Sequence, residues 1–225
     1  MNSKKVIDNQ RSIYDAQIKT HGDSPESTHN QLIEIQNLRF ERLLANIDLA
    51  YNGSIHDVGC GICDMYQYLR ESKSNLIYSG TDIVPAMKEL VGKKYPEINY
   101  FIRDIIEDKT EDSYDYVVLS GTFNLPGDID HQVWKEFTRK MILSMYSIAE
   151  KGIAFNFLTQ KVDFYNPAMY YESMQDIFDF CTTHLSRHVY IDHAYPLYEF
   201  SCTVLKPNTV LERYNHPTFK KYFKS

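Results

Sequence analysis

The sequence contains no run of about 18 apolar residues, the length that spans a bilayer as a helix. Its N-terminus also lacks the apolar stretch of a signal peptide, so we expect a cytoplasmic protein. Four cysteines at no framework spacing argue against a secreted disulfide scaffold. A formal net charge of −6 argues against a protein that binds the phosphates of nucleic acids. Internal repeats, low-complexity tracts and interdomain linkers are also missing.

The remaining composition fits one soluble globular domain. With 225 residues and 43% hydrophobic side chains, the chain is long enough to bury a sizeable core. Residues 1–27 are polar and carry few apolar anchors. We expect the first ten of them to form a frayed arm, and the stretch from Tyr14 onward to form an arm or a lid over a ligand site. The single domain would then cover residues 28–225.

Residues 28–49 carry the pattern of an amphipathic helix. At 100° per residue, one stripe is formed by Leu32, Ile35, Gln36, Arg39, Phe40, Leu43 and Ile47. Gln36 and Arg39 therefore lie near the middle of the face that should be buried. A buried guanidinium needs an anion, because an unpaired buried charge is costly. Two partners remain open for Arg39: a structural salt bridge, or the carboxylate of a ligand.

The rest of the chain alternates between period 2 and period 3.6, the pattern of strands and helices in turn. Strands are expected at residues 54–58, 75–83, 98–103, 114–120 and 153–158, and helices at 64–72, around 87–91, at 131–150 and at 169–184. Residues 188–192 and 198–205 form two more strands, whose connection is too short for a parallel crossover, so they should pair as a hairpin. The sequence therefore predicts an α/β fold. Its doubly wound, seven-stranded, mostly parallel sheet would have an antiparallel last strand, helices on both faces and an N-terminal helical cap.

The first strand ends in an acidic residue and a two-glycine turn, Asp57-Val58-Gly59-Cys60-Gly61. Glycine adds no Cβ and tolerates positive φ, so backbone N–H groups and a helix N-terminus can approach a ligand closely there. The next two strands also end in an acid, Asp82 and Asp104. Each acid alone fits a helix N-cap or a turn. Because ligands of such sheets bind beyond the carboxyl ends of the strands, three acids in register favour a nucleoside site.

The spacing of these acids assigns parts of that site. Asp82 follows Gly61 by 21 residues (82 − 61), which suits an acid that bonds to ribose hydroxyls. Asp104 would accept a hydrogen bond from an adenine amino group, between the apolar faces of Ile83 and Ile105. Ser120 follows the dense apolar run of the fourth strand, at the same edge of the sheet.

These motifs make the chain resemble a class I S-adenosylmethionine-dependent methyltransferase over about residues 39–205, nearly its whole length. The resemblance implies S-adenosyl-L-methionine as the cofactor. Its methionine and ribose portions would be held by Asp57 and the backbone of Gly59, Cys60 and Gly61. An arginine on the preceding helix often meets the methionine carboxylate in this family, and Arg39 is positioned for that. Residues 120–124 and 154–158 resemble, more loosely, a bacterial small-molecule branch of the family.

One position departs from the family pattern, because Cys63 stands where the loop usually has glycine. A side chain there could tighten the loop or tilt the following helix. It also creates a Cys60-x-x-Cys63 motif between a strand and a helix, the setting of a thioredoxin-like redox pair. Acids at the next two strand ends, and Asp64 at the helix start, count against that reading. A nicotinamide-type domain would want glycine at position 64 and a second domain for substrate.

The acceptor side is less defined by the sequence. In-line methyl transfer to a phosphate or carboxylate needs no base, whereas a sugar hydroxyl or an amine does. Histidines that could serve as that base are His21, His131 and His193, of which His21 and His193 are our candidates; each also fits a surface or capping role. We expect acceptor contacts from Tyr14, Phe123, Asn124 and Asn156, and no metal.

We therefore expect methyl transfer to a small molecule: a sugar, a phosphorylated metabolite or a small acid. The alternatives are an RNA methyltransferase, disfavoured by the acidic total, and a non-catalytic cofactor-binding subunit that supports a partner. The loss of the acids or glycines would mark the second alternative, and apart from Cys63 they are intact. The sequence does not indicate an oligomeric state.

Overall fold

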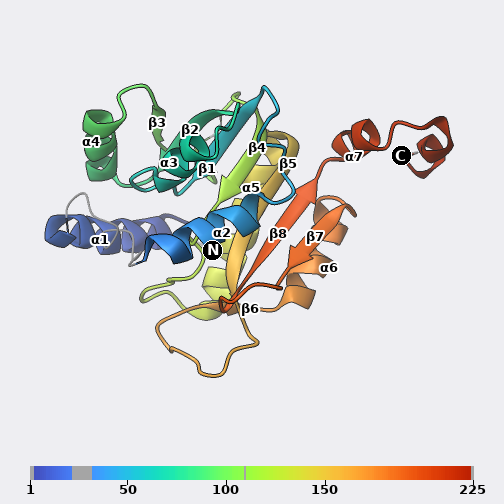
Figure 1. The fold of residues 1–225 in the computed structure, drawn as a ribbon. Helices are drawn as coiled ribbons and strands as arrows, with labels where there is room; N and C mark the ends of the chain where they lie inside the picture. The colour runs from blue at the N-terminus through green and yellow to red at the C-terminus, as the bar shows by residue number, and fades with distance from the viewer. Residues whose placement is uncertain (1–2, 22–31, 109, 224–225) are drawn as a thin grey trace.

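The computed structural model describes residues 3–21, 32–108 and 110–223. Its central sheet runs in the order β3-β2-β1-β4-β5-β8-β7 (Figure 1). The strands are β1 (Ser54–Val58), β2 (Ile77–Asp82), β3 (Asn99–Ile102), β4 (Tyr114–Leu119), β5 (Ala149–Thr159), β7 (Val189–Asp192) and β8 (Glu199–Leu205). Strands β1 to β5 pair in parallel, and β8 pairs antiparallel with both β5 and β7. The predicted fold class, with its terminal hairpin, is confirmed.

Helices cover both faces of this sheet. They are α2 (Ile33–Leu44), α3 (Asp64–Glu71), α4 (Pro85–Lys94), α5 (His131–Ile148), α6 (Met174–His184) and α7 (Pro207–Arg213). Alternate residues of β4 face opposite sides because a strand has a period of 2. Val117 and Leu119 pack with α5 and α6, whereas Tyr116 and Val118 pack with α2, α3 and α4. Both faces of the central strands are thus buried, which explains the continuous apolar run of β4.

The N-terminal segment is helical from its first described residue, Ser3, so the frayed arm expected for the first ten residues is wrong over residues 3–10. Helix α1 (Ser3–His21) buries Val6, Ile7 and Gln10 and contacts α4 and α5. Gln10 Nε2 donates to Leu125 O at 3.0 Å, and Arg11 Nε donates to Ile83 O at 3.0 Å. Both bonds fasten α1 across the carboxyl ends of β2 and β4.

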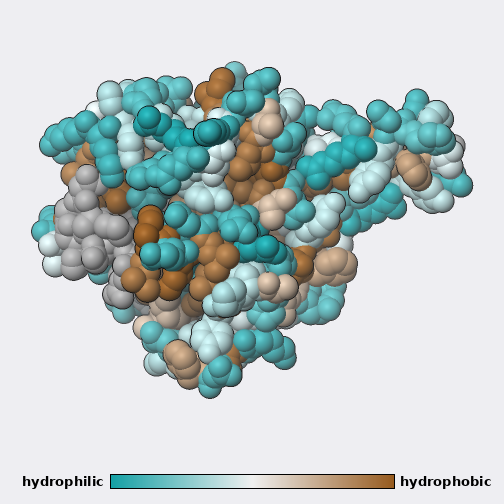
Figure 2. Space-filling view, in the orientation of Figure 1, coloured by the Kyte–Doolittle hydropathy of each residue, from teal (hydrophilic) through white to brown (hydrophobic). Residues whose placement is uncertain are grey.

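Several element boundaries differ from the prediction. Helix α2 ends at Leu44, although Ile47 beyond it is still buried. The start of the predicted 28–49 helix lies outside the described residues. Leu32, Ile33 and Ile35 are exposed, and Figure 2 shows the apolar surface they form at the start of α2. Only the second half of the predicted stripe therefore packs on the sheet.

Three elements were not predicted. A two-residue strand β6 (Tyr171–Glu172) extends β5 in parallel, within the stretch predicted as the start of a helix. After β8 the chain forms α7, which contacts β5, and then the 3₁₀ helix η2 (Pro217–Phe223), which leads away from the sheet (Figure 1). In the described ranges, no helix combines the length and apolarity that a membrane crossing requires.

Candidate active site

A cavity of about 280 Å³ lies at the carboxyl ends of β1, β2 and β4. Its roof is α1, and α2 closes one side. All ten residues predicted to bind the cofactor line it: Arg39, Asp57, Gly59, Cys60, Gly61, Asp82, Ile83, Asp104, Ile105 and Ser120. The structure therefore brings together the residues that were read from separate strand ends.

The glycine turn has the backbone conformation that its sequence predicts. Gly59 and Gly61 have φ of 70° and 52°, and a Cβ on Gly59 would lie 2.4 Å from Thr122 Oγ1. Gly61 N donates to Asp82 Oδ2 at 3.0 Å, and Tyr100 OH donates to Gly61 O at 3.0 Å. The turn is thus fixed to β2 and β3, with its backbone along the cavity wall.

Cys63 occupies the position where the resemblance leads one to expect glycine. Its backbone is left-handed, with φ of 63°, which costs a residue with a Cβ about 1 kcal/mol. Its side chain is fully buried in the core between the sheet and α2–α4, away from the cavity lining. Cys63 therefore shapes the start of α3 without filling the cavity.

The structure describes the four cysteines as buried free thiols. Burial raises the pKa of the Cys60 thiol, so it is held protonated rather than as the thiolate that redox chemistry uses. Throughout the described part of the chain, no group of three metal-ligating side chains comes together.

The three strand-end acids are buried to different degrees. Burial raises the pKa of Asp57 from 3.8 to about 7, against the opposing effect of the hydrogen bond from Tyr78 OH at 2.9 Å. Burial also raises the pKa of Asp82, although its oxygens accept from Gly61 N and Val84 N, each at 3.0 Å. Asp104 is half-buried; burial raises its pKa too, and its Oδ1 accepts from Ile106 N at 2.9 Å. Asp82 and Asp104 therefore also have the local turn role that each would have alone, whereas Asp57 is bonded across the sheet to β2.

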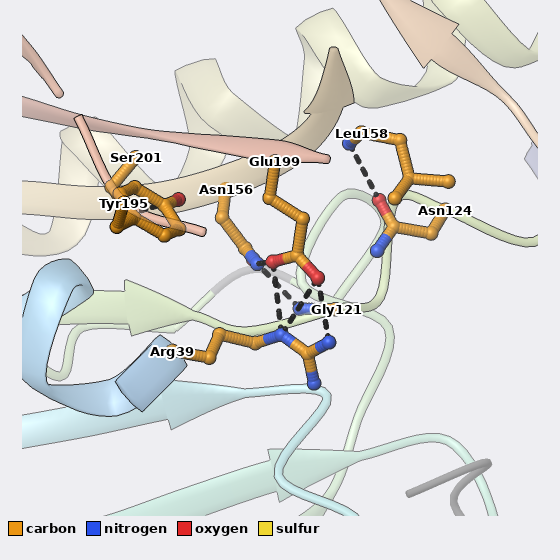
Figure 3. Close-up of polar contacts among 8 residues, drawn as sticks. All are labelled: Arg39, Gly121, Asn124, Asn156, Leu158, Tyr195, Glu199 and Ser201. Atoms are coloured by element: carbon orange, nitrogen blue, oxygen red, sulfur yellow. Dashed lines mark hydrogen bonds and ion pairs between the residues drawn. The ribbon is translucent and has the colours of Figure 1, made fainter. Parts of the chain in front are cut away.

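Arg39 meets an anion of the chain itself at the far end of the cavity. Its Nη2 lies 2.6 Å from Oε1 of Glu199, and Asn156 Nδ2 donates to Oε2 of the same carboxylate at 2.6 Å (Figure 3). Burial opposes the charge of Arg39, but Glu199 outweighs it, so the arginine pKa is raised. Asn156 Oδ1 accepts from Gly121 N at 2.8 Å, so the network ties α2, β5 and β8 to the loop after β4.

Sequence reasoning missed Glu199. It opens β8 in an alternating pattern, where a glutamate is expected to face solvent. In the structure β8 lies between β5 and β7, Leu158 pairs with Glu199, and every residue of β8 is buried. The predicted hairpin could have indicated this burial, because the last strand of the hairpin lies between β5 and β7 and has no solvent-facing side.

The predicted acceptor residues divide into two groups. Tyr14 and Asn124 line the cavity, and burial, followed by the nearby Asp82 carboxylate, raises the pKa of Tyr14 to about 12. Phe123 instead lies in the core, stacked on Phe157 with ring centroids 4.6 Å apart. Asn156 is fully buried behind the cavity lining, where it positions Gly121 and Glu199.

No histidine whose side chain the structure describes lines the cavity. His131 and His193 are exposed, and the side chain of His21 lies outside the described residues. His56 is buried in β1 between Ser79 and Thr81, and burial lowers its pKa to about 3. That ring supports the sheet as a neutral group.

Comparisons with known proteins agree with this geometry. No family model matches the chain. The chain is similar to "Putative methyltransferase Rv1506c" from Mycobacterium tuberculosis (strain ATCC 25618 / H37Rv), with 28% identity over 155 residues. The aligned stretch covers 68% of this chain and 93% of that protein.

Solved structures share the fold at low sequence identity. The magnesium protoporphyrin IX methyltransferase (ChlM) from Synechocystis PCC 6803, solved with bound SAM, superposes with a TM-score of 0.59 at 15% identity, over 90% of this chain and 96% of its own. The N-methyltransferase NodS from Bradyrhizobium japonicum WM9, in complex with S-adenosyl-L-homocysteine, gives 0.60 at 12% identity, over 88% of this chain and 99% of its own. The chain therefore has the fold of these S-adenosylmethionine-dependent methyltransferase structures, and its sequence is similar to a putative methyltransferase.

Proposed function

We propose that the protein transfers a methyl group from S-adenosyl-L-methionine to a small-molecule acceptor by in-line displacement. One observation carries the proposal: the glycine turn and the acids that end β1, β2 and β3 line a single cavity. Asp82 would hold the ribose hydroxyls, and Asp104, Ile83 and Ile105 the adenine. Asp57 and the backbone of the turn would hold the methionine portion, with Arg39 near its carboxylate.

The charge of the cavity supports this cofactor. Five carboxyl side chains and two guanidinium groups line it. S-adenosylmethionine carries a sulfonium, an ammonium and a carboxylate, so its net charge is positive and suits an acidic lining. A nicotinamide dinucleotide would bring a pyrophosphate, which these acids would repel.

The side chains of this protein supply alignment and a dry site. When bound, S-adenosylmethionine supplies a methyl group activated on a sulfonium sulfur. Trp134, Phe137 and Met141 give the cavity an apolar wall, and α1 covers it through Gln10 and Arg11. Excluding water and holding the two reactants in line lowers the barrier without a covalent intermediate.

The roof formed by α1 also supports a small acceptor. A helix fastened across the mouth leaves space for a molecule that fits inside the cavity, rather than for a polymer that must pass through it. The net charge of −6 agrees with this, because an RNA substrate would be repelled.

Calorimetric titration of the full chain tests the cofactor, with NAD as the control. We expect micromolar binding of S-adenosylmethionine and S-adenosylhomocysteine and no binding of NAD. Formation of S-adenosylhomocysteine in the presence of small-molecule mixtures then tests turnover. Failure of both adenosyl ligands to bind would contradict the proposal, and tight 1:1 binding without turnover would favour a non-catalytic cofactor-binding subunit.

A further inference from the structure

One end of the cavity is built from Arg39, which is also a predicted cofactor residue, together with Glu199, Asn124 and the Gly121 backbone (Figure 3). We propose that this end holds an uncharged or positively charged acceptor, an alcohol or an amine that donates a hydrogen bond to Glu199, and that it rejects carboxylate and phosphate acceptors. This inference rests on the proposed function. It names the acceptor class that the sequence leaves open.

Glu199 has room for one more donor. A carboxylate offers about four acceptor sites on its two oxygens. Three donor hydrogens make four contacts with these sites. Arg39 Nη2 and Asn156 Nδ2 each donate to one oxygen at 2.6 Å, and the single hydrogen of Arg39 Nε is shared between both oxygens, at 2.9 and 3.0 Å, so a further donor can replace one half of the shared bond. Glu199 lines the cavity although only 4% of it is exposed. A hydroxyl or amine in the cavity can therefore complete its hydrogen bonding.

Both cationic side chains of the lining already face a carboxylate. Arg39 is paired with Glu199, and Arg103 Nη1 lies 3.1 Å from Asp112 Oδ2. Among the described residues around the cavity there is no lysine. Under the proposed function, the carboxylate of the cofactor also competes for Arg39. An acceptor carboxylate or phosphate would thus enter a lining with five acids and two arginines, where like charge repels it.

Asn124 adds a neutral donor. Its Oδ1 accepts from Leu158 N at 3.1 Å, which turns the amide nitrogen away from Leu158 (Figure 3). Asn124 is 7% exposed and lines the cavity, and its nitrogen has no hydrogen-bond partner among the residues described. A carboxamide N–H binds a lone pair without requiring a negative charge. It therefore fits a carbonyl, ether or hydroxyl oxygen beside the reacting group of the acceptor.

The first experiment compares four probes on one scaffold: benzylamine, benzyl alcohol, benzoate and phenyl phosphate. Each is titrated at pH 7.5 into the full chain saturated with S-adenosylhomocysteine, with ligand-observed NMR as the readout. We expect the amine and the alcohol to bind at least about ten times more tightly than the two anions. Equal binding of all four, binding of none, or preference for an anion would overturn the inference. Loss of S-adenosylhomocysteine binding would instead reject the proposed function, so the two failures are distinguishable.

The second experiment moves the charge. In Glu199→Gln, Arg39 loses its carboxylate partner. The affinity for benzylamine should therefore fall by about tenfold or more, and the affinity for benzoate should rise. Asp192→Asn is the matched control, because it removes the carboxylate partner of Arg42 on the same helix but lies outside the cavity lining. The control should keep the preference of the wild type. A Glu199→Gln protein that also keeps it would refute the role of Glu199.

A third variant guards against misfolding of Glu199→Gln. The double variant Arg39→Gln/Glu199→Gln removes both charges of the pair and leaves no unpaired buried guanidinium. It should still bind benzyl alcohol but no longer separate benzylamine from benzoate. An unchanged preference in this variant would contradict the inference independently of the single variant.

Discussion

Asp82 has two tasks at the residue scale. Its carboxylate fastens the glycine turn to β2 through Gly61 N, and the same group is assigned to the cofactor ribose. Asp82→Ala should therefore lower the affinity for S-adenosylhomocysteine by about 100-fold or more, since charge-assisted hydrogen bonds contribute about 1.5–3 kcal/mol each. Calorimetry gives the affinity, and thermal unfolding shows whether the variant is folded.

Asp115→Ala is the control for this prediction. Asp115 lies on β4 and accepts from Ser54 N at 2.8 Å, so it too fastens a backbone group, but it does not line the cavity. The control should lose stability without losing affinity. Unchanged affinity in Asp82→Ala would remove the ribose assignment.

Asp57 predicts a pH dependence. Burial raises its pKa from 3.8 to about 7, so in the free protein its contribution to stability is present below pH 3.8 and is lost as the pH rises through about 7. A positively charged ligand favours the ionised carboxylate. The affinity for S-adenosylmethionine should therefore fall as the pH drops from 8 to 6, by at most about tenfold per unit, because Asp57 becomes protonated and must release its proton when the ligand binds.

Titration calorimetry in buffers of different ionisation enthalpy measures both the affinity and the released protons. Asp57→Asn should flatten the profile, because its amide does not titrate. A wild-type affinity that stays constant between pH 6 and 8 would show that the charge of Asp57 does not affect ligand binding.

At the element scale, the pair Arg39–Glu199 joins α2 to β8. Removing one partner leaves the other charge buried, and for buried pairs this costs about 3–5 kcal/mol. Because 16% of the Arg39 side chain and 5% of the Glu199 side chain are exposed, we expect about 2 kcal/mol or more for Arg39→Gln and for Glu199→Gln. The double variant should lose less than the sum of both. Urea unfolding of the four proteins gives the coupling energy, and strictly additive losses would contradict a coupled pair.

Helix α1 is expected to act as a lid. Arg11→Ala removes the hydrogen bond to Ile83 O and should speed cofactor dissociation several-fold, measured by stopped-flow displacement, while leaving the fold intact. The neighbouring exposed Ser12 supplies the control, Ser12→Ala, which should dissociate at the wild-type rate. Equal rates for both variants would argue that α1 is a fixed part of the structure.

The sequence predicted well those elements whose pattern repeats locally. Strand ends fall at a definite change of period, so the sequence alone places Asp57, Asp82 and Asp104 at one edge of the sheet. Phe123 and Asn156 were less accessible, because in a sheet buried on both faces the pattern does not tell which neighbour lines the cavity. The burial of Glu199 follows from the order of the strands, which the sequence pattern does not give. The packing of α1 follows from contacts with α4 and α5, which its polar sequence does not predict.

At the scale of the whole molecule, ligand binding should appear as stability. At about 100 times its Kd, S-adenosylhomocysteine should add about 2.7 kcal/mol to the free energy of unfolding. For a domain of this size, about 1 kcal/mol shifts the Tm by roughly 2–4 °C, so we expect a rise of about 5–10 °C. NAD at the same concentration should leave the Tm unchanged, and a shift of equal size with both ligands would argue against a specific site.

The central claim is that three acids at successive strand ends hold one adenosyl cofactor. A crystal structure of the full chain grown with S-adenosylhomocysteine tests it most directly. The account predicts the ribose hydroxyls on Asp82, the adenine between Ile83 and Ile105 with its amino group on Asp104, and the methionine portion along the glycine turn. Density for the ligand at any other place, or a ribose that does not contact Asp82, would contradict it.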